Sequence, residues 1–130
     1  MPRITDETVL AVGRLTLAAT ELEYLLAGIG AGRTDGDHAA IFTASGAPLR
    51  AARGRAQLAA PAHRDEFVGL VEAAATYLLQ SRTAVRALWF DSSQVDAATF
   101  DEISSLIMRC RNRLQALYDE PDHPPVGAPA

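Results

Sequence analysis

The stretch TFDEISSLIMRCRNRLQALY, residues 99–118, decides the fold class. Its apolar residues recur every three or four positions, which is the spacing of one face of an α-helix. They are Phe100, Ile103, Ile107, Cys110, Leu114 and Leu117. Thr99 and Glu102 have the spacing of a capping box, which predicts that the helix begins there. The stretch is therefore expected to be an amphipathic helix with one face in a core.

Two other segments carry the same pattern. The first follows Thr5, a suitable N-cap, and is expected to end at the glycines of residues 28–32. Its stripe is Leu15, Ala18, Leu22, Leu25, Leu26 and Ile29. The second is expected to begin at Pro61 and to be the longest helix. Its stripe is Phe67, Val71, Ala74, Leu78, Ser81, Val85 and Leu88. Shorter helices are expected over residues 38–42 and from Pro48 to Ala59.

Composition agrees with this pattern. Of 130 residues, 48% are hydrophobic and only 6% are aromatic, and alanine and arginine, two strong helix formers, are abundant. We therefore predict an all-α fold, an up-down bundle of four to five helices. Residues 1–118 are expected to form a single helical-bundle domain. The proline-rich residues 119–130 are expected to be a disordered tail.

Charge and cysteine content restrict the function classes. The net charge of −4 argues against broad nonspecific nucleic-acid binding, which needs a basic surface. No apolar run is long enough to span a membrane, and the first residues lack the apolar stretch of a signal peptide. The single Cys110 has no intrachain disulfide partner. These features predict a cytoplasmic protein with no membrane contact.

No cofactor or metal site is expected. The histidines, His38, His63 and His123, lie in separate segments, and no cysteine pair or Glu-x-x-His motif accompanies them. Cys110 lies on a core stripe, where a free thiol is usually buried and inert. No glycine-rich phosphate loop follows a strand.

Two polar features stand out on the predicted helices. Arg82 and Arg86 are four residues apart and share a helix face, which makes them candidates for binding an anion or an RNA phosphate. Solvent exposure, or pairing with acids of another helix, is the alternative. Glu21 lies one position from the first stripe, where a partly buried carboxylate would need an arginine partner. Exposure to solvent is again the alternative.

The segment GRLTLAATELEYLL, residues 13–26, places a Glu-Leu-Glu element inside an apolar stripe. It resembles the first helix of small bacterial HEPN-like helical-bundle proteins, and the layout of residues 5–118 is similar to theirs. In that family a later long helix carries arginine, usually then asparagine, and histidine four to six residues beyond the arginine. Tryptophan often follows.

The family's Arg-x4-6-His motif is degenerate in this chain. Aligned on Trp89, Ser81 stands at the arginine position, Arg82 at the asparagine position and Arg86 at the histidine position. HEPN domains commonly dimerise, and the active ones cleave RNA without metal, using arginine and histidine from two subunits. Arginine stays protonated and cannot act as a general base. The resemblance therefore implies no catalytic residues, with Arg82 and Arg86 retaining phosphate contact at most.

Two other partial matches to the motif are set aside. Arg33 and His38 have the arginine-histidine spacing but lie at a polar Gly/Asp loop, and Arg111-Asn112 is not followed by a histidine. We expect a non-enzymatic homodimer that acts as an interaction or regulatory module, with a protein partner or RNA phosphates as its target. Two alternatives stay open. One is a metal-independent, toxin-like ribonuclease using Arg82, Arg86 and Glu21, and the other is a plain protein-protein adaptor.

Overall fold

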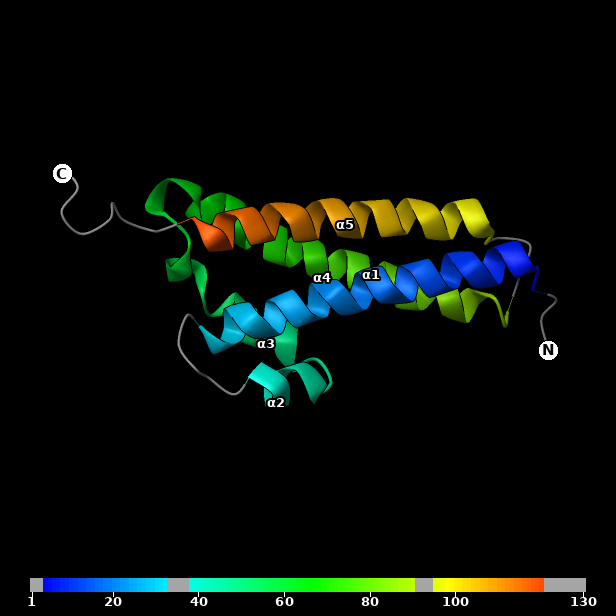
Figure 1. Ribbon diagram of the computed structural model, residues 1–130, viewed down its shortest axis with the longest axis horizontal. Coiled ribbons are helices and arrows are strands. Elements are labelled where there is room, and N and C mark those ends of the chain that lie inside the picture. Colours follow the sequence, from blue (N-terminus) through cyan, green and yellow to red (C-terminus); the bar gives the residue numbers. More distant parts are fainter. Residues whose placement is uncertain (1–3, 33–37, 91–94, 121–130) are drawn as a thin grey trace.

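The computed structural model describes residues 4–32, 38–90 and 95–120, and this part of the chain is helical with no strand (Figure 1). The five α-helices are α1 (Asp6–Ala31), α2 (His38–Thr43), α3 (Ala47–Arg53), α4 (Arg64–Ala87) and α5 (Ala97–Asp119). Two 3₁₀ turns, η1 (Ala56–Leu58) and η2 (Pro61–His63), join α3 to α4. The predicted all-α bundle of four to five helices is confirmed.

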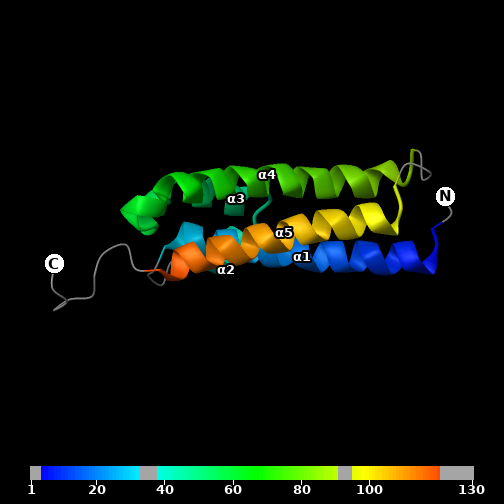
Figure 2. The same ribbon diagram turned by 90° about the horizontal axis from the view of Figure 1, so that it is seen from above.

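The three long helices are arranged up, down and up. α1 and α5 lie side by side and run in the same direction. Two contacts show this: Arg14 pairs with Asp101 near the starts of both helices, and the Tyr118 hydroxyl donates to the Gly32 carbonyl near their ends. α4 runs the opposite way, with Glu66 near its start paired to Arg113 near the end of α5. Figure 2 shows α4 on one side of the bundle and the α1–α5 pair on the other.

The core lies between these three helices and α3. Its largest fully buried side chains are Phe67, Phe100, Leu15, Leu22, Leu26, Ile29, Ile107, Leu114, Leu117 and Val71. All ten lie on the apolar stripes that the sequence predicts. The stripes drift by one residue in places. Ala84 is buried where Val85 was expected, and Ser104 is buried while Ile103 is only partly so. A helix of 3.6 residues per turn does not hold an alternating 3-4 spacing over many turns.

A glycine allows α3 to lie against α1. A Cβ atom added to Gly30 would come within 2.4 Å of the Ala51 Cβ, which is closer than real Cβ contacts. The Arg55 Nε then donates to the Gly30 carbonyl at 3.0 Å, which fixes η1 to the end of α1. The two helices therefore pack at a distance that only glycine at position 30 permits.

The helix ends partly follow the predicted caps. The Thr5 hydroxyl accepts a bond from the Thr8 backbone amide at 3.1 Å, and Gly32 closes α1 with a φ of 80°. The predicted start of the last helix at Thr99 was wrong. Asp96 is the N-cap, and its carboxylate accepts from the Thr99 amide at 2.9 Å. Aspartate caps at least as well as threonine and lies three residues earlier.

Other helix boundaries also differ from expectation. The helix predicted from Pro48 to Ala59 is shorter than expected. It corresponds to α3, which ends at Arg53 because Gly54 follows and favours the end of a helix. The helix expected from Pro61 begins at Arg64, after η2, so its 24 residues are fewer than the 26 of α1. Asp119, assigned to the tail by sequence, is the last residue of α5. The rest of that tail beyond Glu120 lies outside the described residues.

The core assignment predicts different costs for two neighbouring residues of α5. Ile107 is fully buried and Met108 is 52% exposed. Ile107→Ala should lower the free energy of unfolding by about 2–5 kcal/mol, because it leaves a cavity. Met108→Ala, the matched control, should change it by less than about 0.5 kcal/mol. Urea titration followed by circular dichroism measures both values, and equal costs would contradict the packing described.

Candidate functional site

Arg82 and Arg86 lie on the exposed surface of α4, one helical turn apart. Neither forms an ion pair or a hydrogen bond with another described residue. The pairing with acids that the sequence left open is therefore not found in the described part of the chain. Ser81, at the position of the family's arginine, is buried and contributes to the core.

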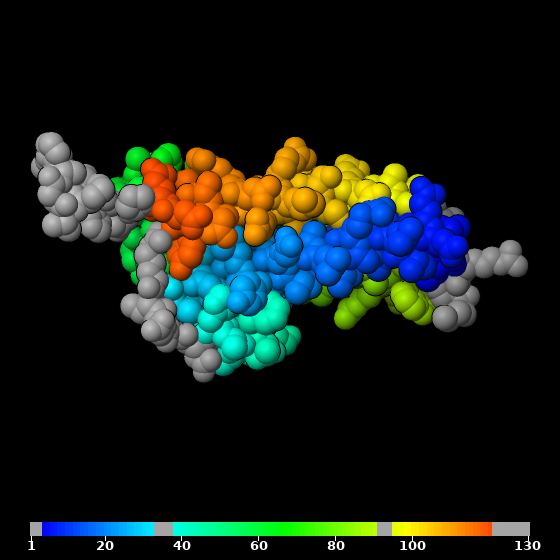
Figure 3. All heavy atoms as spheres, viewed as in Figure 1, coloured from blue at the N-terminus to red at the C-terminus, as the bar shows by residue number. Residues whose placement is uncertain are grey.

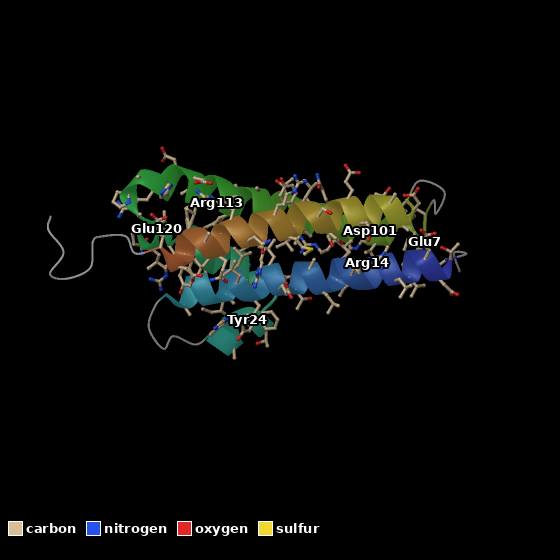
Figure 4. The ribbon with its side chains drawn as sticks, turned by 45° about the horizontal axis from the view of Figure 1, so that its top comes forward. Glu7, Arg14, Tyr24, Asp101, Arg113 and Glu120 are labelled. Carbon is tan, nitrogen blue, oxygen red and sulfur yellow. The ribbon has the colours of Figure 1, made fainter. Side chains whose placement is uncertain are left out.

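Three other arginines contrast with this pair. Arg14 binds both carboxylate oxygens of Asp101, Arg53 binds both oxygens of Glu72, and Arg113 binds both oxygens of Glu66. Figure 4 labels Arg14 and Asp101 facing each other from α1 and α5. In these three pairs the positive charge is already matched within the chain. The positive charges of Arg82 and Arg86 have no such match among the described residues and are available to another molecule.

The ion pairs also shift the pKa of the acids that take part in them. The Arg113 guanidinium, through its hydrogen bonds to the carboxylate, lowers the pKa of Glu66 below its ordinary value. Arg53 lowers the pKa of Glu72 in the same way. Both carboxylates, which are charged at neutral pH in any case, therefore keep their charge to a lower pH than an unpaired glutamate does.

Large apolar side chains lie near Arg82 and Arg86, the two arginines of α4 that have no partner among the described residues. Leu79 is 57% exposed, Trp89 59% and Phe90 89%, all in or just after the last turns of α4. Residues three or four apart lie on the same side of a helix, so Leu79, Arg82 and Arg86 form one strip. We call these three residues, with Trp89 and Phe90, the α4 patch. The patch combines unmatched positive charge with accessible aromatic rings.

Of the two alternatives that the sequence leaves open for Glu21, the structure shows exposure to solvent. Its side chain is exposed and forms no ion pair or hydrogen bond with another described residue. Glu21 lies one position away from the stripe residue Leu22, and that rotation turns it out of the core. It instead lines two adjoining hollows along the boundary of α1 and α5.

The larger hollow is a pocket of about 500 Å³ between α1, α2 and α5. Figure 3 shows these helices as adjoining bands, with α1 between α5 above and α2 below. Most of the pocket wall is apolar. The lining residues are Leu17, Thr20, Glu21, Tyr24, Leu25 and Gly28 of α1, His38 and Phe42 of α2, and Arg111, Gln115 and Tyr118 of α5. We call this space the α1–α2–α5 pocket.

An aromatic cluster forms the α2 side of this pocket. The Tyr24 ring lies 4.4 Å from the His38 ring and 5.2 Å from the Phe42 ring, measured between centroids. The His38 Nε2 lies 3.2 Å from the Tyr24 carbonyl oxygen, which can only accept, so this nitrogen is the donor. Figure 4 shows Tyr24 where α1 meets α2. These contacts hold the short α2 against α1.

The α5 side contributes an incompletely bonded arginine. Arg111 is half-buried, and its Nη1 donates to the Asn112 amide oxygen at 3.1 Å. Its Nε is buried and has no hydrogen-bond partner among the described residues. A buried polar group without a partner is costly, by about 1–3 kcal/mol. The neighbouring Tyr118 hydroxyl is already engaged, donating toward the Gly28 and Gly32 carbonyls at 3.3 and 3.0 Å.

The sequence did not identify this pocket. Arg111 and His38 each appeared only in partial motif matches, which gave no reason to place them together. One signal was available: Leu17 and Tyr24 are seven residues apart and off the core stripe, so they mark a second apolar line on the first helix. The position of α2, which completes the pocket, depends on the tertiary fold.

Cys110 was expected in the core and is there, 4% exposed. Its Sγ donates to the Leu70 carbonyl at 3.4 Å. Burial raises the pKa of the thiol to about 11. The thiolate, which is the nucleophilic form, is therefore scarce at neutral pH.

Comparison with known proteins adds no family assignment. A scan against family models, a search of curated proteins and a search of solved structures each found no match to this chain. None of the helices in the described residues has the length and apolar content that a membrane span requires, and no group of three or more acids, histidines or cysteines there is arranged to hold a metal ion. The HEPN-like resemblance therefore stays a prediction.

The buried thiol gives a direct chemical test. In the folded protein at pH 8, alkylation of Cys110 by iodoacetamide should be about 100-fold slower than in the urea-unfolded chain. A pKa raised from 9.0 to about 11 removes two powers of ten of thiolate. Mass spectrometry of timed samples measures both rates. Similar rates in the two states would contradict a buried Cys110.

Proposed function

We propose that this chain is a non-catalytic, HEPN-like interaction module that binds the phosphate backbone of RNA through the α4 patch. The observation that carries the proposal is that Arg82 and Arg86 are exposed, adjacent and unpaired within the described chain. Two guanidinium groups on one helix face, about 6 Å apart at their Cβ atoms, repel each other unless an anion lies between them. A phosphate oxygen is a preferred partner of a guanidinium.

The aromatic residues of the α4 patch favour single-stranded RNA. Trp89 and Phe90 are exposed at 59% and 89%. Unpaired bases stack on such rings without regard to sequence, while arginines bind the backbone. A double helix hides its base faces and would leave both rings in water.

The chemistry of the patch supports binding without cleavage. Arg86 stands where the resembling family has its histidine, and an arginine keeps its proton at all physiological pH values. It can hold a phosphate but cannot accept a proton from the ribose hydroxyl. The net charge of −4 makes the binding weak and local, so it should be strongest at low salt.

Removing the two charges should abolish RNA binding. With a fluorescein-labelled single-stranded RNA at low salt, Arg82→Gln with Arg86→Gln should weaken binding at least tenfold by fluorescence anisotropy. The slope of log K against log salt should fall by about 1.4, because each lost phosphate contact on a single strand removes about 0.7. The RNA should remain intact throughout.

Arg64→Gln is the control, because Arg64 is an exposed arginine at the other end of α4 and forms no ion pair within the described part of the chain. It changes the net charge but not the α4 patch, so it should leave the affinity within twofold. Equal loss in the control would show that overall charge, not the patch, is responsible. Cleavage of RNA by the wild type that Arg86→Ala removes would favour the ribonuclease alternative.

A homodimer is the second candidate, and one observation favours it. Leu10, Leu17 and Tyr24 are 62%, 69% and 54% exposed, and they follow one another at seven-residue spacing along α1. Met108 of α5, 52% exposed, lines the same hollow as Leu17. An apolar line with a seven-residue repeat is typical of packing against another helix. In this proposal a second copy packs against the part of the line around Leu10 and against Met108, as the HEPN-like resemblance implies, and leaves Tyr24 and the α1–α2–α5 pocket uncovered.

Leu10→Glu should convert this dimer to a monomer, because it places a charge in the buried interface. Light scattering coupled to size exclusion should then give half the wild-type mass. Val68→Glu is the control, since Val68 is 46% exposed on α4, away from this line, and should leave the mass unchanged. A wild type that is monomeric at all concentrations would contradict the dimer.

The proposed location is the reducing cytoplasm. Cys110 is buried as a free thiol, and free buried cysteines are compatible with a reducing compartment.

A further inference from the structure

The α1–α2–α5 pocket lies apart from the α4 patch and has the properties of a small-molecule site. Its volume of about 500 Å³ is in the range that binds small organic ligands. Its wall is mostly apolar, and Tyr24, Phe42 and Tyr118 contribute aromatic rings from three different helices. Such walls favour a ligand with a flat apolar body.

Two charged groups in the pocket have no counterion among the residues that the structure describes. The Arg111 Nε is buried without a hydrogen-bond acceptor, and Arg111 forms no ion pair with a described residue. Glu21 lines the same pocket and is likewise without an ion pair among those residues. The two side chains therefore share one pocket without neutralising each other. The pocket therefore offers a positive group on α5 and a negative group on α1.

The other polar groups of the pocket are largely satisfied. The Gln115 amide donates to Asp119 at 2.8 Å, and the Thr20 hydroxyl donates to the Thr16 carbonyl at 2.7 Å. His38 is bonded to the Tyr24 carbonyl. Arg111 and Glu21 are consequently the two groups that would discriminate between ligands. A simple anion would meet repulsion from Glu21, and a simple cation would meet repulsion from Arg111.

We propose that the α1–α2–α5 pocket binds a small aromatic zwitterion, of the type of an aromatic amino acid or a short aromatic dipeptide. The ligand carboxylate accepts from the terminal nitrogens of the Arg111 guanidinium, which lines the pocket and forms no ion pair with a described residue. The ligand ammonium group lies toward Glu21, and the ring packs among Tyr24, Phe42 and Tyr118. This site is independent of RNA binding by the α4 patch.

The charge pattern can be tested with matched ligands. Isothermal titration of the full chain would compare L-tryptophan and glycyl-tryptophan with tryptamine, which lacks the carboxylate, and indole-3-propionate, which lacks the ammonium group. At least one of the two zwitterions should bind at least tenfold more tightly than both singly charged analogues. Which of the two binds better distinguishes an amino-acid site from a dipeptide site.

Variants then assign each charge to its side chain. Glu21→Gln should remove the discrimination between L-tryptophan and indole-3-propionate, and Arg111→Gln should remove that between L-tryptophan and tryptamine. Arg109→Gln is the matched control, because Arg109 is an exposed arginine of the same helix outside the pocket and should leave the affinities unchanged. Circular dichroism melts verify folding, and the exposed Glu21 provides a test even where Arg111→Gln destabilises the chain.

Three results would overturn the proposal. The first is no detectable binding of either zwitterion to the folded wild type at millimolar concentration. The second is equal affinity for all four ligands, which would indicate apolar contact alone. The third is an unchanged preference of Glu21→Gln for L-tryptophan over indole-3-propionate, which would place the binding elsewhere.

Discussion

The burial of one face of α1 is the constraint on which the rest of the structure depends. Within the described chain, α1 contacts all four other α-helices. Leu15, Leu22 and Leu26 are completely buried in these contacts, and Gly30 removes the side chain that would separate α1 from α3. Burial of apolar area is the main favourable term in folding. If α1 were rotated about its own axis, its buried leucines would face solvent and the protein would lose most of its core.

This constraint also determines what α1 presents on its other side. The helix is apolar around more than one face, so Leu10, Leu17 and Tyr24 stay at the surface once the core stripe is buried. The short α2 covers part of that surface through the aromatic contacts of Tyr24. The part of that surface next to α5 lines the two hollows between α1 and α5. Both the proposed dimer surface and the α1–α2–α5 pocket therefore follow from a helix with more apolar area than the monomer buries.

Ion pairs separate the arginines into two groups. Those between helices, such as Arg14 with Asp101 and Arg113 with Glu66, join neighbouring elements at the surface and are worth little individually. Arg82, Arg86 and Arg111 form no ion pair with a described residue. Two of these are exposed on α4, and one is half-buried in a pocket. Two adjacent exposed arginines suit a phosphate backbone, whereas one half-buried arginine in a pocket suits a single small ligand.

The sequence by itself determined the fold class and most of the core. With 3.6 residues per helical turn, apolar residues three or four positions apart lie on one face, so their spacing identifies the face that is buried. It also placed Arg82 and Arg86 on one face. The boundaries at Asp96 and Arg53 needed local geometry, since several residues compete to cap or end a helix. Only the tertiary structure decided that Glu21 is exposed and that it shares a pocket with Arg111. Those residues are 90 positions apart, and the packing of α1 beside α5 brings them together.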